Sequence, residues 1–289
     1  MVSTIAIIGA SGTNAAPWTD AFLAAGWKVR NLIRDPERVA PRTNRTAAAL
    51  DLDDRRSYEP ALAGVDVLGL VTPAAPQQAA REIGLIEAAG RSGVARIIRV
   101  SVMGAELAQP ISPFARWSAE IDAALSRSNI PHVLLRANGY MQNLLRQRGS
   151  IEAGLYVQPT GETAASYLDV RDIADVAVAA ANGSFDGEVL TLTGPEALTG
   201  AQVAAVLSQA VGRPVRFVSP DLDWFGAELI QNGVPKWRVD ALVEVHANIL
   251  AGRGSHLSAV SPDVLAETGR PPRALRQFAE HAFSLRSVA

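Results

Sequence analysis

Residues 4–15 read TIAIIGASGTNA, an apolar run that enters a glycine-rich turn. The isoleucines before Gly9 are typical of a buried strand, and a helical pattern follows from about Asn14 to Gly26. A strand, a glycine turn and a helix together begin a βαβ unit, whose helix N-terminus can bind the pyrophosphate of a dinucleotide. We expect Gly9 to make the sharp turn and Gly12 to let the phosphates approach the backbone without a Cβ in the way.

The glycine spacing reads G-x-x-G-x-x-A, with Ala15 at the last position, where helix and strand come close. It differs from the G-x-G-x-x-G pattern of many dehydrogenases. A plain tight turn after an apolar run is the alternative interpretation, and the next strand has to decide between the two. On the dinucleotide interpretation, the residues expected at the pyrophosphate are Gly9, Ser11, Gly12, Thr13 and Asn14.

The composition argues against several classes of function. The 289 residues are 48% apolar and carry a net charge of −2, which gives no reason to expect a nucleic-acid partner. The chain has no cysteine, and its 4 histidines lack metal-ligand spacing, so we expect no metal site. No apolar run reaches the ~18–20 residues that span a membrane, and the N-terminus lacks a basic signal-peptide region. We therefore expect a cytoplasmic protein that acts on a small molecule and has no membrane partner.

Residues 28–34 predict the second strand, which ends at Arg34 before a turn at Asp35 and Pro36. In a dinucleotide-binding fold, the end of this strand meets the adenosine ribose. An acidic residue there favours NAD, whereas an arginine can pair with the 2′-phosphate of NADP. Arg34 therefore predicts NADP(H) as the cofactor, with a surface arginine at a strand end as the alternative.

Two further strands follow. Residues 47–52 predict a third strand, and we expect Asp51 and Leu52 to lie beside the adenine. Residues 65–71 are almost continuously apolar, as expected for a strand of a parallel sheet buried on both faces. The cofactor-binding candidates where this strand ends are Val71, Thr72 and Pro73.

Strands and helices continue to alternate. The predicted elements are a helix at 77–92, a strand at 95–101, a helix at 117–128 and a strand at 132–136. This alternation predicts an α/β fold with a doubly wound parallel Rossmann sheet, since right-handed crossovers leave the carboxyl ends of the strands on one rim.

The pattern changes after residue 149. It predicts strands at 166–170, 188–193 and 213–218, a helix at 172–181, a helix capped by Thr199 and a mostly helical stretch at 221–289. We expect residues 1–150 to form the Rossmann domain, with a later contribution from about 165–195. Residues 151–289 would then form mainly a smaller, mostly helical C-terminal substrate lobe.

At this point the chain resembles the NmrA-like family of atypical short-chain dehydrogenases. The matching motifs are GASG (9–12), LIRDP (32–36), ALDLDD (49–54), LVTP (70–73), SVMGA (101–105), LRANGYMQN (135–143), YLDVRDIA (167–174), LTGPEALT (192–199) and TGRPPR (268–273). The resemblance implies an extended Rossmann domain, a preference for NADP and a C-terminal substrate lobe. Members of the family reduce quinones, cationic dyes, imines or activated double bonds, and others bind NADP and act as regulators without turnover.

The chain departs from the family pattern at two places. Ala15 replaces the last glycine of the family's G-x-x-G-x-x-G turn. No tyrosine is followed four residues later by lysine, so the usual Tyr-x-x-x-Lys proton relay is absent. Some relatives keep only the lysine, and alignment with them puts Ser118 at its position. The chain has only two lysines, Lys28 and Lys236, and neither is near that helix in the sequence.

The remaining site candidates follow the fifth and sixth predicted strands. The predicted catalytic residues are Ser101, Asn138 and Tyr140, each of which could face the nicotinamide; a turn cap at Ser101 and a structural tyrosine are the alternatives. The predicted substrate pocket consists of Met103, Trp117 and Met141, although such residues are more often plain core. We interpret Arg136 as half of a structural ion pair, and Asp169 and Asp172 as capping or loop-orienting groups.

The sequence thus predicts an NADP(H)-dependent oxidoreductase. We expect it to transfer hydride to or from a small, largely apolar conjugated or cationic substrate, such as an iminium ion, a quinone or an enone. The alternatives are an NADP(H)-sensing regulatory protein without turnover and a redox-neutral enzyme that keeps the cofactor. The sequence leaves the oligomeric state and the direction of reaction open.

Overall fold

The computed structural model describes residues 3–9, 12, 15–40, 42–183 and 186–284. The chain divides into two compact units, each built from three stretches of sequence. The first unit consists of Met1–Val102, Trp117–Arg136 and Val170–Thr191, and the second of Met103–Arg116, Ala137–Asp169 and Leu192–Ala289.

Within the described residues, the first unit is organised around a seven-stranded sheet with the order β3-β2-β1-β4-β5-β6-β8. The strands are β1 (Thr4–Ile8), β2 (Lys28–Ile33), β3 (Arg45–Ala49), β4 (Val67–Leu70), β5 (Arg96–Val102), β6 (His132–Ala137) and β8 (Glu188–Leu192). From β3 to β5 the neighbouring strands pair in parallel. The predicted Rossmann-type parallel sheet is confirmed.

Continuous apolar runs place β1 and β4 in the middle of the sheet. Ile5, Ile7 and Ile8 of β1 are fully or almost fully buried, and every residue of β4 is buried. A strand with no exposed face can be apolar at every position, because both of its faces lie against other elements. Ile5 is in register with Val29 of β2 and Val67 of β4.

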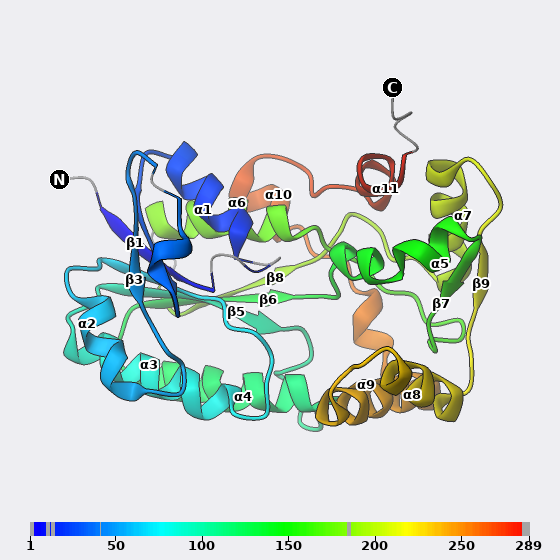
Figure 1. The fold of residues 1–289 in the computed structure, drawn as a ribbon, viewed down its shortest axis with the longest axis horizontal. Coiled ribbons are helices and arrows are strands. Elements are labelled where there is room, and N and C mark those ends of the chain that lie inside the picture. The colour runs from blue at the N-terminus through cyan, green and yellow to red at the C-terminus, as the bar shows by residue number, and fades with distance from the viewer. Residues whose placement is uncertain (1–2, 10–11, 13–14, 41, 184–185, 285–289) are drawn as a thin grey trace. The chain divides into compact units, whose positions relative to one another are not determined.

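Helices cover both faces of the sheet, as Figure 1 shows. The helices are α1 (Ala16–Ala24), α2 (Tyr58–Leu62), α3 (Gln78–Arg91), α4 (Pro113–Arg127) and α6 (Val170–Asn182). Helices α1 and α6 pack together on one face, and α3 and α4 lie on the other. On the α1 face, a Cβ added to Gly69 would lie only 3.1 Å from the Trp18 ring, so the glycine makes room for this fully buried side chain.

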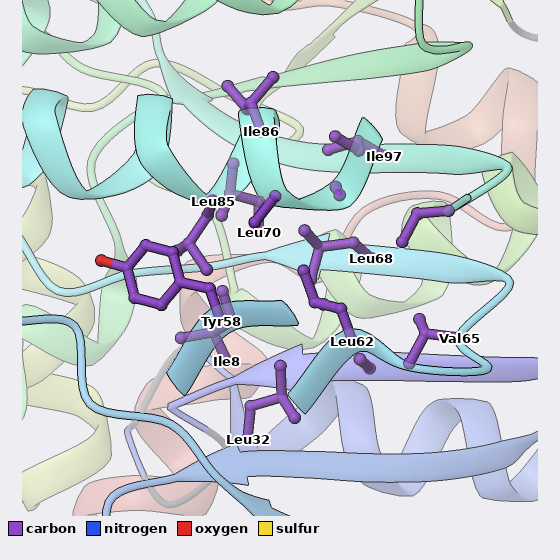
Figure 2. Close-up of a cluster of buried hydrophobic side chains, with 14 of the residues drawn as sticks. Ile8, Leu32, Tyr58, Leu62, Val65, Leu68, Leu70, Leu85, Ile86 and Ile97 are labelled. Atoms are coloured by element: carbon purple, nitrogen blue, oxygen red, sulfur yellow. The ribbon is translucent and has the colours of Figure 1, made fainter. Parts of the chain in front are cut away.

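A hydrophobic cluster fills the space between the sheet and the α2–α3 face (Figure 2). The sheet contributes Ile8, Leu32, Leu68, Leu70 and Ile97, while α2 and α3 contribute Tyr58, Leu62, Leu85 and Ile86. Most of these side chains are no more than a few per cent exposed. Burial of this kind contributes about 1.5–3 kcal/mol for each large side chain. The cluster therefore holds the strand ends of the first unit in fixed positions.

The second unit has its own core. Its elements are β7 (Leu155–Val157), β9 (Arg216–Val218), α5 (Arg148–Glu152), α7 (Gly200–Val211), α8 (Leu222–Gln231), α9 (Lys236–Asn248), α10 (Asp263–Thr268) and α11 (Leu275–Phe283), with short helical turns at Met141–Gln147, Ile249–Arg253 and Ser255–Ser258. Strands β7 and β9 pair in parallel. Helix α7 begins with a capping box, in which Thr199 accepts from the backbone N–H of Gln202, as predicted.

The predicted strand at 166–170 is wrong. Leu168 makes only an isolated bridge with Tyr140, and Val170 already begins α6. The reason is that the polar groups of this segment bond to loops, not to a neighbouring strand. The Ser166 hydroxyl donates to the carbonyl of Ala259, and Asp169 accepts from the Gln142 side chain.

The largest shifts of the predicted boundaries in the first unit are at β3 and α4. Strand β3 ends at Ala49, before the predicted end at residue 52, because Asp51 accepts from the backbone N–H of Asp53 and starts a turn. Helix α4 begins at Pro113, four residues before the predicted start, with the hydroxyl of Ser112 accepting from the N–H of Ala115. In the part of the chain that the structure describes, no helix is long and apolar enough to cross a membrane.

Candidate functional site

The strand order creates a switch point between β1 and β4. From β1 the chain continues outward through β2 and β3, whereas β4 and β5 extend in the opposite direction. In open parallel sheets, ligands bind in the crevice beyond the carboxyl ends of the strands at such a point. The residues that follow these two central strands are Gly9 and Val71, and both are candidates from the sequence.

Two glycines are described in the turn after β1. Gly9 has a φ of 66°, a conformation that favours glycine, and its N–H donates to the carbonyl of Leu32 at 3.0 Å. The N–H of Gly12 donates to the carbonyl of Gly9 at 2.7 Å, and Gly12 in turn accepts from Ala16, the first residue of α1. These bonds link Gly9 and Gly12 to the end of β2 and the start of α1.

Position 12 favours glycine within the protein itself. A Cβ there would lie 3.2 Å from the carbonyl oxygen of Gly9, which is closer than most real contacts. Ala15 is buried at the start of α1, and no side chain caps the helix. The N–H groups of Ala16 and Trp18 donate to carbonyls of the chain itself, and residue 17 is a proline without an N–H. This helix end can therefore offer an anion the positive end of its dipole. The other predicted phosphate contacts, Ser11, Thr13 and Asn14, lie outside the described residues.

A hollow of about 700 Å³ lies beside the end of β2. Its lining residues are Asn31, Ile33, Arg34, Asp35, Arg38, Val39 and Arg45. The side chains of Arg34 and Arg38 are 77% and 82% exposed, so their guanidinium groups are accessible. Arg34 lies 3.8 Å from Asp51 and Arg38 lies 2.9 Å from Asp35, which leaves the hollow with an excess of positive charge.

Two buried polar atoms of this hollow have no hydrogen-bond partner among the described residues. They are the Oδ1 atom of Asn31 and the Nε atom of Arg45. Buried polar atoms are usually paired, so atoms without a partner indicate a place for a polar ligand or water. Three arginines around one concave surface fit a phosphate group, because guanidinium groups bind phosphate oxygens in pairs. The residues present therefore fit the 2′-phosphate of NADP(H).

Asp51 and Leu52 follow β3, at the same edge of the sheet. The Asp51 carboxylate is engaged in its own turn, and the Leu52 carbonyl accepts from the hydroxyl of Tyr58 at 2.7 Å. Leu52 also packs against the hydrophobic cluster of Figure 2. This pair is held rigidly, and its contact with an adenine stays a prediction.

A buried network of charged and polar side chains connects the ends of β4 and β5. Arg99 is completely buried, and its Nε atom donates to Glu82 at 2.8 Å. It also donates through Nη1 to Asp122 of α4. At one end of the network the Thr72 hydroxyl donates to Glu82, and at the other end the Ser101 hydroxyl donates to Asp122 at 2.7 Å. Arg136 lies 3.9 Å from Asp122, which agrees with its interpretation as an ion-pair residue.

This network fixes what the hydroxyl groups of Thr72 and Ser101 can do. A hydroxyl has one hydrogen to donate and two lone pairs to accept with. Because each hydrogen is used within the network, each hydroxyl can offer only its oxygen. The oxygen of the half-buried Thr72, which accepts from Gln78 at 3.5 Å, can still accept from a ligand, whereas Ser101 is fully buried. The Thr72 oxygen suits an N–H donor, for example a carboxamide, and does not suit a carbonyl oxygen. Burial raises the pKa of Asp122, and the charge of Arg99 and the bond from Ser101 oppose that rise.

Ser118, at the position where some relatives have lysine, is buried beside Arg99. The Nη2 atom of Arg99 donates to its hydroxyl at 3.4 Å. The positive charge in this part of the first unit therefore belongs to Arg99. Sequence reasoning missed this group, although an arginine inside the apolar strand β5 is a visible signal, because charged residues are almost never fully buried unless they are paired.

Asn138 and Tyr140 belong to the second unit. The Asn138 amide donates to the hydroxyl of Ser166 and to the carbonyl of Leu257, both at 2.8 Å, and its oxygen accepts from the N–H of Gly139. Asn138 is therefore saturated within the protein and holds the neighbouring loops together. Tyr140 is half-buried at the start of the turn Met141–Gln147.

The predicted pocket residues have different surroundings. Met141 packs in the core of the second unit, together with Leu144 and Tyr156. Met103 is also buried in the second unit, and Trp117 is a half-buried residue of the first unit. The contact of these three residues with a substrate stays a prediction. Among the described residues, no group of acidic or histidine side chains could hold a metal ion.

The comparisons with known proteins agree with this architecture. Residues 1–244 match the model of the NmrA-like family. The chain is 34% identical to the NAD(P)H azoreductase of Xenophilus azovorans over 280 residues, which cover 96% of both chains. It is 31% identical to the (4-alkanoyl-5-oxo-2,5-dihydrofuran-3-yl)methyl phosphate reductase of Streptomyces griseus, over 96% of this chain and 98% of that one.

Among solved structures, an NADPH-dependent quinone oxidoreductase of Escherichia coli in complex with NADPH has the same fold. The TM-score is 0.85 at 24% identity, with 97% of this chain and 100% of that chain covered. The family match spans most of the chain, and the first relative is similar over nearly its full length. The protein described here belongs to the NmrA-like family of atypical short-chain dehydrogenases.

Proposed function

We propose that this protein is an NADPH-dependent reductase that transfers hydride to small, largely apolar, conjugated or cationic organic molecules without a Tyr-x-x-x-Lys relay. The coarser prediction, an NAD(P)H-dependent oxidoreductase, is confirmed by the two curated relatives, which are reductases, one of them named for its use of NAD(P)H. The substrate class and the roles of single residues are the proposal.

The observation that carries the proposal is the Gly9 turn at the switch point, in the same unit as the arginine hollow beside β2. The turn and the N-terminus of α1 would hold the pyrophosphate, and Arg34 with Arg38 would hold the 2′-phosphate. Thr72 would accept a hydrogen bond from the carboxamide, since its own hydrogen is committed to the buried network. Ser101, which is fully buried, would hold that network in place. When bound, NADPH supplies the hydride.

The substrate class is supported by the chemistry that the relatives' names describe. An azo group is a conjugated N=N bond, and the dihydrofuranone carries a C=C bond in conjugation with carbonyl groups. Both accept hydride at an electrophilic atom of a conjugated system. A pocket for such molecules needs to orient a flat, apolar substrate and to exclude water.

The experiment is a screen for NADPH oxidation, which is measured as the loss of nicotinamide absorbance. An azo dye, a quinone, an enone and a cationic triphenylmethane dye are offered to the protein, with NADH in a parallel series. We expect turnover with at least one conjugated acceptor and a higher kcat/KM with NADPH than with NADH. Tight NADPH binding without turnover of any acceptor would favour the NADP(H)-sensing regulator. A product formed without net NADPH consumption would favour the redox-neutral enzyme.

A further inference from the structure

We propose that Asp35 binds the 2′-hydroxyl of NADH in the same hollow in which Arg34 and Arg38 would bind the 2′-phosphate of NADPH. The inference rests on the cofactor site of the proposed function. It adds that the protein accepts both cofactors and that Asp35 limits its preference for NADPH. An acidic residue near the end of this strand is the group that hydrogen-bonds the ribose in proteins that bind NAD.

Asp35 lies between the end of β2 at Ile33 and the short helical turn Pro36–Arg38. It lines the hollow beside β2 together with Arg34 and Arg38. Its side chain is 50% exposed, so the carboxylate is accessible to a ligand. The other charged residues described in the lining are three arginines. One negative group therefore stands in a hollow that is otherwise positive.

The turn holds Asp35 beside Arg38. The N–H of Arg38 donates to the carbonyl of Asp35 at 3.2 Å, and Pro36 begins the turn with a restricted φ. The two side chains then meet, because the Nε atom of Arg38 donates to Oδ2 of Asp35 at 2.9 Å. An arginine that is held through Nε keeps its Nη1 and Nη2 groups for a phosphate.

The second oxygen of the Asp35 carboxylate is left for a ligand. Within the described part of the chain, the bond from Arg38 to Oδ2 is the one hydrogen bond of this side chain. A carboxylate has two oxygens and about four positions at which it can accept. Oδ1 can therefore accept from a ribose hydroxyl while Oδ2 keeps Arg38 in place.

Asp51, the other acid near this strand end, is less suited to the role. Its Oδ1 atom already accepts from the backbone N–H of Asp53, and Asp51 is not among the residues that line the hollow. Asp51 lies 3.8 Å from Arg34, so it acts on the hollow mainly by reducing the charge of that arginine.

The two cofactors meet opposite charges at this place. A 2′-hydroxyl donates a hydrogen, so it is stabilised by the Asp35 carboxylate. A 2′-phosphate carries negative charge, so it is attracted by Arg34 and Arg38 and repelled by Asp35. The preference between NADPH and NADH is then set by the balance of these interactions, and Asp35 shifts that balance towards NADH.

The test replaces Asp35 with asparagine and measures the Kd of NADPH and of NADH by titration. The Asn side chain has nearly the same shape, and its Oδ1 atom can still accept from Arg38, so the change removes mainly the charge. We expect NADH to bind about three- to fivefold more weakly and NADPH about three- to fivefold more tightly, as for charges at exposed positions. The ratio of the two Kd values should therefore change about tenfold or more.

The matched control is Glu37→Gln. Glu37 lies in the same turn, is exposed and has the same charge as Asp35, but it does not line the hollow. This variant should change neither Kd by more than about twofold, because charges that are separated by solvent are screened. An effect of net charge alone would appear equally in both variants.

A third ligand, 2′-deoxy-NADH, separates the hydrogen bond from a change of shape. It lacks the hydroxyl, so it should bind wild type more weakly than NADH does and should bind Asp35→Asn and wild type equally. Added salt gives an independent readout. It should reduce the gain in NADPH affinity of Asp35→Asn, since the repulsion that the change relieves is screened.

Weaker binding of both cofactors to Asp35→Asn would show that Asp35 only holds Arg38 in place, and would overturn the inference. Unchanged affinities, or a 2′-deoxy-NADH that responds to the change as NADH does, would overturn it too. The expected shifts in Kd, in a protein that oxidises NADPH with no acceptor, would leave the role of Asp35 intact and overturn the proposed function. A wild type that binds neither cofactor would overturn both.

Discussion

The hydroxyl of Ser101 donates to Oδ2 of Asp122 over 2.7 Å, inside a network that also contains Arg99. Ser101 is fully buried, and its hydrogen is committed to a carboxylate. It cannot at the same time donate to a substrate carbonyl, which is the role that a serine at the end of this strand would need in carbonyl reduction. The network therefore favours substrates that accept hydride without help from Ser101.

The network also contributes to stability, and Asp122→Asn measures that contribution. The change removes a negative charge from a buried pair and leaves Arg99 with Glu82 as its one remaining strong partner. Loss of one partner of a buried ion pair lowers the free energy of unfolding by about 3–5 kcal/mol. Because Arg99 keeps its pair with Glu82, we expect a loss near the lower end of this range. Urea unfolding checks this. Ser118→Ala removes only the 3.4 Å bond to Arg99, so it should cost much less, and an equal loss would contradict the assignment.

Cofactor preference is tested by Arg34→Ala. A charge-assisted hydrogen bond contributes ~1.5–3 kcal/mol, so loss of Arg34 should weaken NADPH binding about ten- to a hundredfold. NADH binding should hardly change, because NADH lacks the 2′-phosphate. Calorimetric or fluorescence titration of both cofactors measures the difference. Arg56→Ala is the control, since Arg56 is highly exposed, pairs with Asp54 and does not line the hollow. A wild-type preference for NADH would show that the end of β2 does not bind the 2′-phosphate of NADPH.

The glycine turn is tested by Gly12→Val. The branched side chain would stand where the pyrophosphate comes close, and its Cβ would press on the carbonyl of Gly9. We expect NADPH affinity to fall at least a hundredfold, with a far-UV circular dichroism spectrum like that of wild type. Gly149→Ala, in a position with open space around it, is the control. Unchanged NADPH affinity in a folded Gly12→Val variant would show that the turn does not bind the cofactor and has only a structural role.

Local sequence patterns predicted the sheet well because its strands are buried on both faces. The apolar runs at β1 and β4, the glycine turn and the arginine after β2 are all short-range signals. The error at 166–170 has the opposite origin. Ser166 and Asp169 use their hydrogen bonds with Ala259 and Gln142, so the conformation of this segment depends on distant parts of the chain.

The same reasoning explains which parts of the candidate site were missed. The roles of Thr72 and Ser101 depend on which groups accept their hydrogens, and those groups, Glu82 and Asp122, come from two different helices. No pattern within a local window of the sequence contains such relations.

A buried histidine predicts how stability depends on pH. His246 of α9 is 7% exposed and contacts the ring of Phe225, and burial lowers its pKa from 6.5 to about 4. Because the folded pKa lies below the unfolded one, protonation favours the unfolded chain. The stabilisation is complete above pH 6.5 and is lost as the pH falls towards 4, by about 3 kcal/mol in all. Urea unfolding at several pH values should show a shallower dependence in His246→Gln than in wild type. If the free energy of unfolding varied with pH equally in both proteins, His246 would not be the source of the pH dependence.

The last prediction concerns Tyr140. A tyrosine acts as an acid in this class of enzymes when a lysine four residues later assists it, and here that position holds Leu144, which is buried in the core of the second unit. Tyr140→Phe keeps the ring and removes only the hydroxyl. Removal of a true general acid costs ~10²–10⁴-fold, so this variant should lose much less than that in single-turnover rate.

Tyr140→Ala should lose more than Tyr140→Phe, because removal of the ring changes the shape of the pocket and the position of the substrate. The order of the two variants therefore distinguishes a shape effect from proton transfer. Rates are measured with the quinone and with the cationic dye, so that a loss of proton donation would appear only with the quinone. A thousandfold loss in Tyr140→Phe, confined to the quinone, would make Tyr140 the acid and would overturn this mechanism.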